Sequence, residues 1–402
     1  MLLISVCFFY QMVYLVIPFL PGRRLRSDVP LRHYAVLVAA RNEEAVLPHL
    51  LDSLNAQDYP KELIDIFVVA DNCTDATAQV AREHGATVFT RFNRNQVGKG
   101  YALDYLLERI RSEIGLADFD AFLIFDADNL VAPDYIRQMN RLPAAGYDAF
   151  CGYRNSKNFA TSWISSGHSL WYLHESSHMN RSRMRCGVCC HVNGTGFGFT
   201  RALLEKMGGW HFFTLTEDIE FNNWCATHGV KTGYCHDAVL YDEQPITFSQ
   251  SWKQRTRWAQ GGYQVILRYF RPLARGIFRG GWQGWSCFEM TTISACGFGI
   301  SACAGVLSFL VSFLTEPLKV TVASLCWALV IAYFSLMLMG VLTLVLEWKR
   351  IQASGAQKLA SVLTFPLYMM TFAPISFMAL FQKFRWEPIR HTVAISAGQL
   401  RH

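Results

Sequence analysis

Four long apolar runs constrain the fold of this chain more than any other feature of its sequence. They cover residues 2–20, 287–314, 320–346 and 359–381 and are almost free of charged side chains. Since roughly 20 apolar residues span the hydrocarbon core of a bilayer, each run is long enough to cross a membrane. Between the first two runs, residues 31–262 have ordinary charge density and enough length to bury a core. The sequence therefore predicts a folded domain inserted between transmembrane helices.

Basic residues predict the side of the membrane on which this domain lies. Arg23, Arg24, Arg26 and Arg32 follow the first apolar run, and no Lys or Arg precedes it. The positive-inside rule then places the large domain in the cytoplasm and makes residues 1–22 an N-terminal transmembrane anchor. The anchor lacks the basic start and the small-residue cleavage site of a signal peptide. We expect a multi-pass protein of the cell membrane.

The C-terminal third has three predicted parts. Residues 263–286 mix Arg with apolar and aromatic side chains, a composition typical of an amphipathic helix in the headgroup plane. Residues 287–381 form a C-terminal transmembrane region with two spans, and a basic tail follows at 382–402. Two prolines interrupt the last apolar run, and a full crossing would put the basic tail outside the cell. We expect a re-entrant or interfacial hairpin there, with a third span as the alternative.

Charge gives no indication of a nucleic-acid partner. The net charge is +6, and much of the basic excess flanks apolar segments. At those positions Lys and Arg would meet anionic lipid headgroups. The bilayer is therefore the partner that the charge pattern favours.

Strands and helices are predicted to alternate within residues 31–262. The apolar β-rich runs are YAVLVAA (34–40), IDIFVVA (64–70), ATVFT (86–90) and AFLIFDA (121–127), and helical patterns separate them. This alternation predicts an α/β domain with a largely parallel sheet covered on both faces. Ligands of such sheets bind beyond the carboxyl ends of the strands. The polar residues that end these strands are Arg41, Asn42, Glu43, Asp71, Asp75, Asp126 and Asp128.

The stretch FDADN (125–129) carries the clearest inorganic chemistry. Asp126 and Asp128 lie two residues apart at the end of a predicted buried strand. Two such carboxylates can hold one hard divalent cation, with substrate phosphates as further ligands. A cation at a diphosphate stabilises the leaving group as its bond breaks. The alternative is that the pair only caps the helix that follows.

Seven motifs occur in the order found in membrane-integrated family 2 glycosyltransferases. They are VLVAARNEE, VVADNCTDAT, VGKGYALDY, IFDADN, NGTGFGF, LTEDIEF and QRTRW. The chain resembles the synthases of cellulose, hyaluronan and poly-N-acetylglucosamine over nearly its whole length, including the C-terminal RWEPIRHT. The resemblance implies a GT-A domain, a Rossmann-like fold that uses a UDP-sugar with Mg2+ or Mn2+ and inverts the anomeric carbon. Ala39 departs from a common Pro, and ADNCTD lacks the paired Asp of many members, but neither change removes a group that the chemistry needs.

The resemblance also assigns roles to individual residues. The donor-binding residues would be Glu43 near the nucleoside, Asp71 at the uracil base, Lys99 at the phosphates, Asp126, Gln254 and Arg257. The acceptor-binding residues would be Gly194, Thr195, Gly196, Glu217 and Trp258. Asp128 would bind the metal directly, Asp126 would share it or contact the nucleotide, and Asp218 would be the general base.

The chemistry of inverting transfer supports these roles. An acceptor hydroxyl attacks one face of the sugar while the diphosphate leaves from the other, so a carboxylate must take the hydroxyl proton. Asp218, in the first turn of a predicted helix, can do this, although acidic residues there also favourably meet the helix dipole. Arg257 offers a planar fork for phosphate oxygens, and Trp258 offers a face on which a sugar can stack. The alternative for Arg257 and Trp258 is a place at the lipid interface.

The sequence thus predicts a membrane-bound hexosyl- or N-acetylhexosaminyl-transferase. The first hypothesis is a processive synthase of a β-linked polysaccharide, working as a homo-oligomer or with an accessory export protein if the product leaves the cell. The second is a single transfer to a lipid or short glycan. A different class of hypothesis is a non-catalytic domain that binds nucleotide or glycan and supports another synthase. The intact set of motifs argues against that last class.

Overall fold

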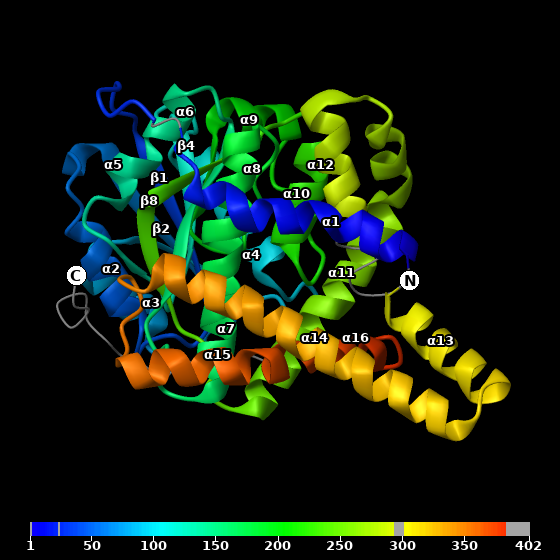
Figure 1. Cartoon of the computed structure of the whole chain (residues 1–402). Helices are drawn as coiled ribbons and strands as arrows, with labels where there is room; N and C mark the ends of the chain where they lie inside the picture. Colours follow the sequence, from blue (N-terminus) through cyan, green and yellow to red (C-terminus); the bar gives the residue numbers. More distant parts are fainter. Residues whose placement is uncertain (1, 23–24, 293–300, 383–402) are drawn as a thin grey trace.

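The computed structural model describes residues 2–22, 25–292 and 301–382, which form an α/β domain and a group of C-terminal helices (Figure 1). The domain is built on an eight-stranded sheet with the order β3-β2-β1-β4-β7-β6-β8-β5. The strands are β1 (Tyr34–Ala40), β2 (Ile64–Asp71), β3 (Thr87–Arg91), β4 (Ala121–Asp126), β5 (Leu130–Val131), β6 (Ala149–Ser156), β7 (Phe197–Thr200) and β8 (Thr232–Asp242).

The first four strands match the four predicted apolar runs to within one residue at nearly every end. β1 pairs in parallel with β2 and with β4, and β2 pairs in parallel with β3. The sheet is mixed, however, because β7 runs antiparallel to both β4 and β6, and β5 runs antiparallel to β8. The expectation of a largely parallel sheet therefore holds only for the half that contains β1 to β4.

Helices cover both faces of the sheet, as the sequence predicted. The helices of the α/β domain are α2 (Leu47–Asn55), α3 (Thr77–Glu83), α4 (Lys99–Glu113), α5 (Tyr135–Met139), α6 (Arg141–Ala144), α7 (Trp163–His174), α8 (Arg181–Cys186), α9 (Arg201–Met207) and α10 (Glu217–Thr227). Alternate residues of β1 face opposite layers, since a strand has a period of two. Leu37 packs in the core layer that includes α4 and α10, whereas Val36 and Val38 pack against α2 and α5.

Helix α11 (Phe248–Ile277) is one continuous 30-residue helix that joins the α/β domain to the following helices. It begins with a reciprocal cap in which the Thr247 hydroxyl accepts from Gln250 and the Gln250 side chain accepts from Thr247. The predicted boundary at 262 between the domain and the amphipathic segment falls inside this helix. Helix α12 (Gly281–Thr291) packs back on it, with Val265 and Cys287 in the shared core.

The C-terminal apolar runs form α13 (Ser301–Thr315), α14 (Leu318–Glu347), α15 (Gly355–Met370) and α16 (Phe372–Ala379). Among the described residues, Leu318–Glu347 and Gly355–Ala379 are long and apolar enough to cross a membrane. The α13–α14 hairpin projects away from the α/β domain (Figure 1). The last run divides at Thr371, where α15 ends and α16 begins. Residues 293–300 and the basic tail from 383 onward lie outside the described residues.

Two further contacts anchor the apolar helices to the domain. Helix α1 (Leu2–Val16) packs Tyr10 and Tyr14 against Met179 of a π-helix, η3 (Glu175–Asn180). At the other end of the chain, the buried carboxylate of Glu347 in α14 accepts a 2.6 Å hydrogen bond from the Tyr153 hydroxyl of β6. The predicted membrane segments are therefore joined to the sheet by specific polar and aromatic contacts.

Gly198 in β7 tests how tightly the mixed half of the sheet is packed. A Cβ atom at this position would lie 2.4 Å from the backbone oxygen of Phe122 in β4. Because a backbone atom cannot move aside cheaply, we expect Gly198→Ala to lower the free energy of unfolding by roughly 2–3 kcal/mol. Thermal unfolding of the detergent-solubilised protein measures this. Gly305→Ala is the matched control, because a Cβ there has no neighbour within 4 Å, and equal melting of both variants would contradict the account.

Candidate functional site

Lys99 is the point at which four of the sequence motifs meet. It is the first residue of α4, after Gly98, whose φ of 137° lies in the region that favours glycine. Its ammonium donates to the carboxylate of Asp126 and, at 2.6 Å, to the backbone oxygen of Gly194. The same Nζ atom lies 3.9 Å from Oε1 of Glu217. The GKG, DAD, NGTG and TED motifs thus share one cation beyond the carboxyl end of β4.

Burial and charge shift the pKa values of the acidic pair at the start of α10. Burial raises the pKa of Glu217 to about 7, although the Lys99 ammonium opposes this and Asp218 adds to it. Burial also raises the pKa of Asp218, against the effects of Lys99 and Arg154. For Lys99, burial alone would lower the pKa, but the carboxylates of Asp126 and Glu217 raise it above its ordinary value. The site therefore holds a charged ammonium beside two carboxyl groups, those of Glu217 and Asp218, whose pKa values are raised.

The NGTG turn lies directly over the aspartate motif. The Thr195 hydroxyl donates to the side-chain oxygen of Asn129 and accepts from the backbone N–H of Asp126 at 2.9 Å. Gly194 and Gly196 have φ values of 79° and 60°, which favour glycine. A Cβ on Gly194 would be 3.5 Å from Oδ2 of Asp218. The predicted acceptor turn is thus in contact with both the predicted metal-binding motif and the predicted base.

The predicted metal ligands offer oxygen atoms of the right chemistry but do not complete a site alone. Asp128 is buried, and the Asn129 amide bridges Oδ1 of Asp128 at 3.4 Å and Oδ1 of Asp242 at 2.9 Å. Among the described residues, no three His, Cys, Asp or Glu side chains form a metal-binding group. Carboxylate oxygens suit Mg2+ and Mn2+, which commonly use one or two carboxylates and take further ligands from phosphates and water. Asp126 and Asp128 fit that arrangement.

Arg154, at the end of β6, connects several parts of the site and was missed by the sequence analysis. Its guanidinium donates to Oδ2 of Asp242 at 3.0 Å from Nε and to the backbone oxygen of Asn193 at 2.7 Å from Nη1. The guanidinium carbon lies 3.7 Å from the ring centroid of Tyr172, whose ring packs edge-on against Trp258 at 6.2 Å. Arg154 thereby links β8, the NGTG turn and the QRTRW helix.

Asp242 was also missed, although a signal for it exists. It ends β8 in the stretch VLYDEQ, and Arg154 lies near the end of β6 in CGYRNS. The rule that polar residues at strand ends line the site would have found both, had these two strands been recognised. Burial raises the pKa of Asp242 to about 6, although Arg154 opposes this and the charge of Asp128 adds to it.

The polar residues at the ends of β1 and β2 mostly form hydrogen bonds and ion pairs with neighbouring residues of the domain. The Asp71 carboxylate is buried and accepts a 2.7 Å hydrogen bond from Arg91 in β3. The backbone N–H of Glu43 donates to the Thr77 hydroxyl at 2.9 Å, and that hydroxyl donates to Asp75 at 2.6 Å. Asp75 therefore shapes the loop, whereas Asp71 stands at the strand end predicted for it but in a buried ion pair.

The three predicted residues of QRTRW occupy different environments on α11. Trp258 packs against Tyr172 and, with a ring separation of 5.8 Å, against His168. Within the described part of the chain, Arg257 makes no hydrogen bond or ion pair, and the buried Oε1 atom of Gln254 has no partner. Arg255 between them is structural, because it donates to the Thr371 hydroxyl at 2.7 Å and to the backbone oxygen of Tyr368. Gln254 and Arg257 thus keep hydrogen-bonding capacity, but no contact joins them to the carboxylates around Lys99.

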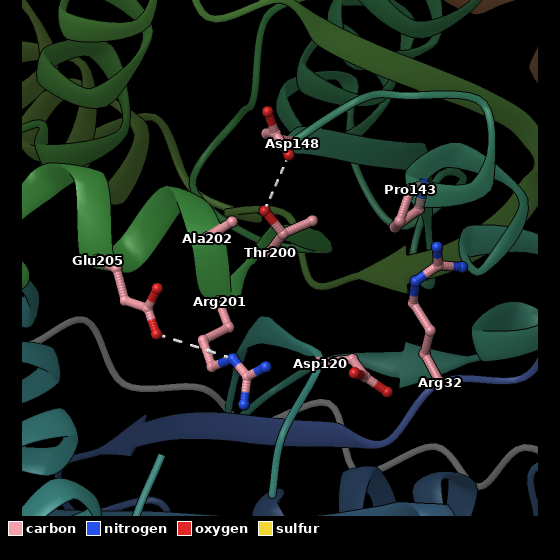
Figure 2. A pocket seen from close by; sticks show the side chains of 8 residues that line it. All are labelled: Arg32, Asp120, Pro143, Asp148, Thr200, Arg201, Ala202 and Glu205. Atoms are coloured by element: carbon pink, nitrogen blue, oxygen red, sulfur yellow. Dashed lines mark hydrogen bonds and ion pairs between the residues drawn. The ribbon is translucent and has the colours of Figure 1, made fainter. Parts of the chain in front are cut away.

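A separate cavity of about 310 Å³ lies at the opposite edge of the sheet (Figure 2). Asp120 precedes β4 and Arg32 precedes β1, so this edge is the amino end of the parallel strands. The cavity mixes acidic and basic groups, and Asp148 accepts a 3.0 Å hydrogen bond from Thr200 there. None of the predicted site residues lines it. Ligands of parallel sheets bind at the carboxyl edge of the strands, so the edge at which the Lys99 cluster lies is the better candidate for the functional site.

Comparison with known proteins connects this site to a sequence family. Residues 30–261 match the family described as "Glycosyltransferase like family 2". The chain is 28% identical over 256 residues to the beta-monoglucosyldiacylglycerol synthase of Synechocystis sp., covering 61% of this chain and 51% of the relative. It is 27% identical over 240 residues to the poly-beta-1,6-N-acetyl-D-glucosamine synthase of Staphylococcus epidermidis, covering 59% and 56%. The chain spans about half the length of the curated relatives it matches.

A solved structure supports the GT-A-like fold. The mannosyltransferase PcManGT from Pyrobaculum calidifontis, determined in complex with GDP-Man and Mn2+, superposes with a TM-score of 0.60. The match covers 93% of this chain and 96% of that structure at 18% sequence identity. The mixed eight-stranded sheet described above is therefore a GT-A-like α/β fold.

The Arg154–Asp242 ion pair can be tested by a double-mutant cycle. Either single substitution, Arg154→Leu or Asp242→Leu, leaves a buried charge without its partner, which costs roughly 3–5 kcal/mol of stability. The double variant removes both charges and should lose much less than the sum of the two single changes. Urea unfolding in detergent measures the three values. Additive losses would contradict the account, because they would mean that the two side chains do not depend on each other.

Proposed function

The chain belongs to glycosyltransferase family 2, and from this premise we propose that it transfers a sugar from a UDP-sugar to a hydroxyl group at a membrane, inverting the anomeric carbon. The observation that carries the proposal is the meeting of Asp126 and Glu217 around the Lys99 ammonium beyond the sheet, with Asp218 next to Glu217. An ammonium and a buried carboxylate side by side are what a diphosphate leaving group and an attacking hydroxyl require.

Asp218 acts as the general base in this proposal. It stands in the first turn of α10 near the NGTG turn, which would hold the acceptor hydroxyl close to it. Burial removes water from around the carboxylate and raises its pKa, which strengthens its attraction for the hydroxyl proton. Glu217 keeps its proton up to about pH 7 and can then donate a hydrogen bond to the acceptor or donor. Holding both reactants in place supplies the rest of the rate enhancement.

Lys99, Asp126 and Asp128 form the donor-phosphate side of the proposed site. Lys99 brings positive charge to the diphosphate, and Asp126 and Asp128 would hold Mg2+ or Mn2+. When bound, the cation supplies Lewis-acid stabilisation of the negative charge that develops on the diphosphate. Gln254 and Arg257 have the unused hydrogen-bonding capacity needed to contact the donor, and Trp258 offers a ring for the acceptor sugar.

The surface of α11 and α12 supports an acceptor that arrives from the membrane. Leu267 and Phe278 are 85% and 90% exposed, and Phe270 of α11 and Trp285 of α12 are also exposed. Exposed Arg271 and Arg275 interleave with these apolar side chains on α11, which is typical of a helix in the headgroup region. The same helix carries QRTRW. We propose a cytoplasmic domain with its acceptor entrance at the membrane.

The first proposed product is an extended β-linked polysaccharide, and the similarity to poly-beta-1,6-N-acetyl-D-glucosamine synthases supports it. Single transfer to a lipid is the second, and two observations favour it. The beta-monoglucosyldiacylglycerol synthase of Synechocystis sp. is a relative of comparable similarity. The exposed apolar face of α11 would also bring a lipid hydroxyl close to the site. A homo-oligomer or an accessory export protein is needed only if the product is an exported polysaccharide.

Nucleotide release tests the proposed function directly. Purified protein in detergent, given a panel of UDP-sugars with Mn2+ or Mg2+ and either diacylglycerol or an oligosaccharide primer, should release UDP with one donor. Asp218→Asn, which keeps shape but not basicity, should lower the rate at least about 100-fold. Gel and thin-layer separation then distinguishes a long polymer from a glycolipid. UDP binding without release from any donor would contradict the enzymatic proposal and support a binding role.

The pH dependence of kcat/KM follows from the environment of Asp218. The base must be ionised, so kcat/KM should rise with pH, with its midpoint above the ordinary range of an aspartate because burial raises the pKa. Arg154 lowers that pKa, so Arg154→Gln should move the acidic limb to higher pH. Arg201→Gln, at the opposite edge of the sheet, is the control and should leave the limb in place. An acidic limb that stays unmoved in Arg154→Gln would contradict this assignment of the base.

A further inference from the structure

One face of α11 carries residues of the QRTRW motif and also contacts the segment that precedes the proposed base. Gln254, Arg257, Gly261, Gln264 and Arg268 recur at intervals of three or four residues, so they form a single stripe along the helix. The first two belong to the motif proposed to bind the donor. The remaining three contact the chain just before and within the first turns of α10. The stripe therefore connects two parts of the site through one rigid element.

The three contacts are close and of different kinds. A Cβ on Gly261 would lie 2.4 Å from the Thr216 hydroxyl, so α11 can approach Thr216 only with glycine at this position. The Gln264 side chain accepts a 3.1 Å hydrogen bond from the backbone N–H of Leu215. The Arg268 guanidinium donates to Oε1 of Glu220, two residues beyond the proposed base.

Glu220 binds the segment that precedes α10 through its other carboxylate oxygen, Oε2. That atom accepts 3.0 Å hydrogen bonds from the backbone N–H groups of both Phe213 and Thr214. The side chain is fully buried, while that of Arg268 is 56% exposed. A buried carboxylate without a cation would be costly, so Arg268 stabilises the charge that fixes this loop.

The same loop contacts the start of α4 on its other side. The rings of Phe213 and Tyr101 stack with centroids 4.6 Å apart, and a Cβ on Gly100 would lie 2.0 Å from the backbone oxygen of Phe212. Gly100 and Tyr101 directly follow Lys99. The loop therefore lies between the residue proposed to meet the donor phosphates and the helix that carries the proposed base.

We propose that Glu220 and Arg268 are a positioning pair for the transfer reaction: they fix the loop 212–216 so that Lys99 and Asp218 keep the relative placement that the reaction requires. The inference rests on the proposed function for its rate effect. Neither side chain touches the carboxylate cluster around Lys99, so their action is through the loop. Because a misplacement of about 1 Å can lower a rate on the order of 100-fold, a loosened loop should act on kcat more than on donor binding.

Four variants test the pair. Arg268→Ala removes an exposed side chain, and Glu220→Gln keeps the shape of the carboxylate but not its charge. Both should lower kcat about tenfold or more while changing the donor KM less than about twofold. Arg268→Lys should recover most of the loss, because it restores the cation. Arg137→Ala is the matched control, since it removes a comparably exposed Arg from an ion pair with Asp58 outside α11.

Amide hydrogen exchange of Phe213 and Thr214 supplies a readout that does not depend on turnover. Exchange at these two groups should accelerate in Arg268→Ala and remain as in the wild type in Arg137→Ala. Wild-type kcat in both Arg268→Ala and Glu220→Gln, or unchanged exchange in both, would overturn the proposal. A wild-type protein that releases no nucleotide would overturn the proposed function instead, while the contrast in exchange would still support the link between α11 and the loop.

Discussion

The ion pair between Lys99 and Asp126 is the interaction on which the rest of the site depends. Three carboxyl groups, those of Asp126, Glu217 and Asp218, gather around Lys99, and neighbouring negative charges repel one another. The partly buried Lys99 ammonium makes the arrangement possible, and it also donates a hydrogen bond to the Gly194 carbonyl, which ties the NGTG turn to the same point. The Lys99 ammonium and a set of acidic groups therefore lie side by side, each stabilising the other's charge.

Helix α11 connects the site with the apolar C-terminal helices. It carries QRTRW near its start, packs against α10 along its middle, and exposes Leu267 and Phe270 in its second half; Phe278, directly after its last residue, is also exposed. Arg255 ties the same helix to the last apolar segment through Tyr368 and Thr371. The predicted boundary at residue 262 between the glycosyltransferase domain and the interfacial segment falls within this continuous helix. The helix therefore connects the QRTRW motif with an exposed apolar surface.

The sequence predicted the parts of the fold whose patterns are local. Strands β1 to β4 are apolar runs bounded by polar residues, and the motifs at their ends were placed correctly beyond the carboxyl edge. Strands β6, β7 and β8 were not predicted, because β7 has only four residues with a glycine among them and the pairing of all three depends on contacts distant in sequence. Arg154 and Asp242 were missed for the same reason. The burial that sets the pKa of Asp218 and Glu217 also arises from tertiary packing and has no local signature.

The central claim is that this edge of the sheet is a metal–diphosphate site that the nucleotide itself completes. Asp126 is engaged by Lys99, and the described residues hold no group of three metal ligands, so the protein alone should bind Mn2+ weakly. The direct measurement is the electron paramagnetic resonance signal of free Mn2+ during titration of the purified protein, with and without UDP. The account predicts weak Mn2+ binding alone and tight binding with UDP, lost in Asp128→Asn. Mn2+ binding that is equally tight without UDP, or that is unchanged in Asp128→Asn, would contradict it.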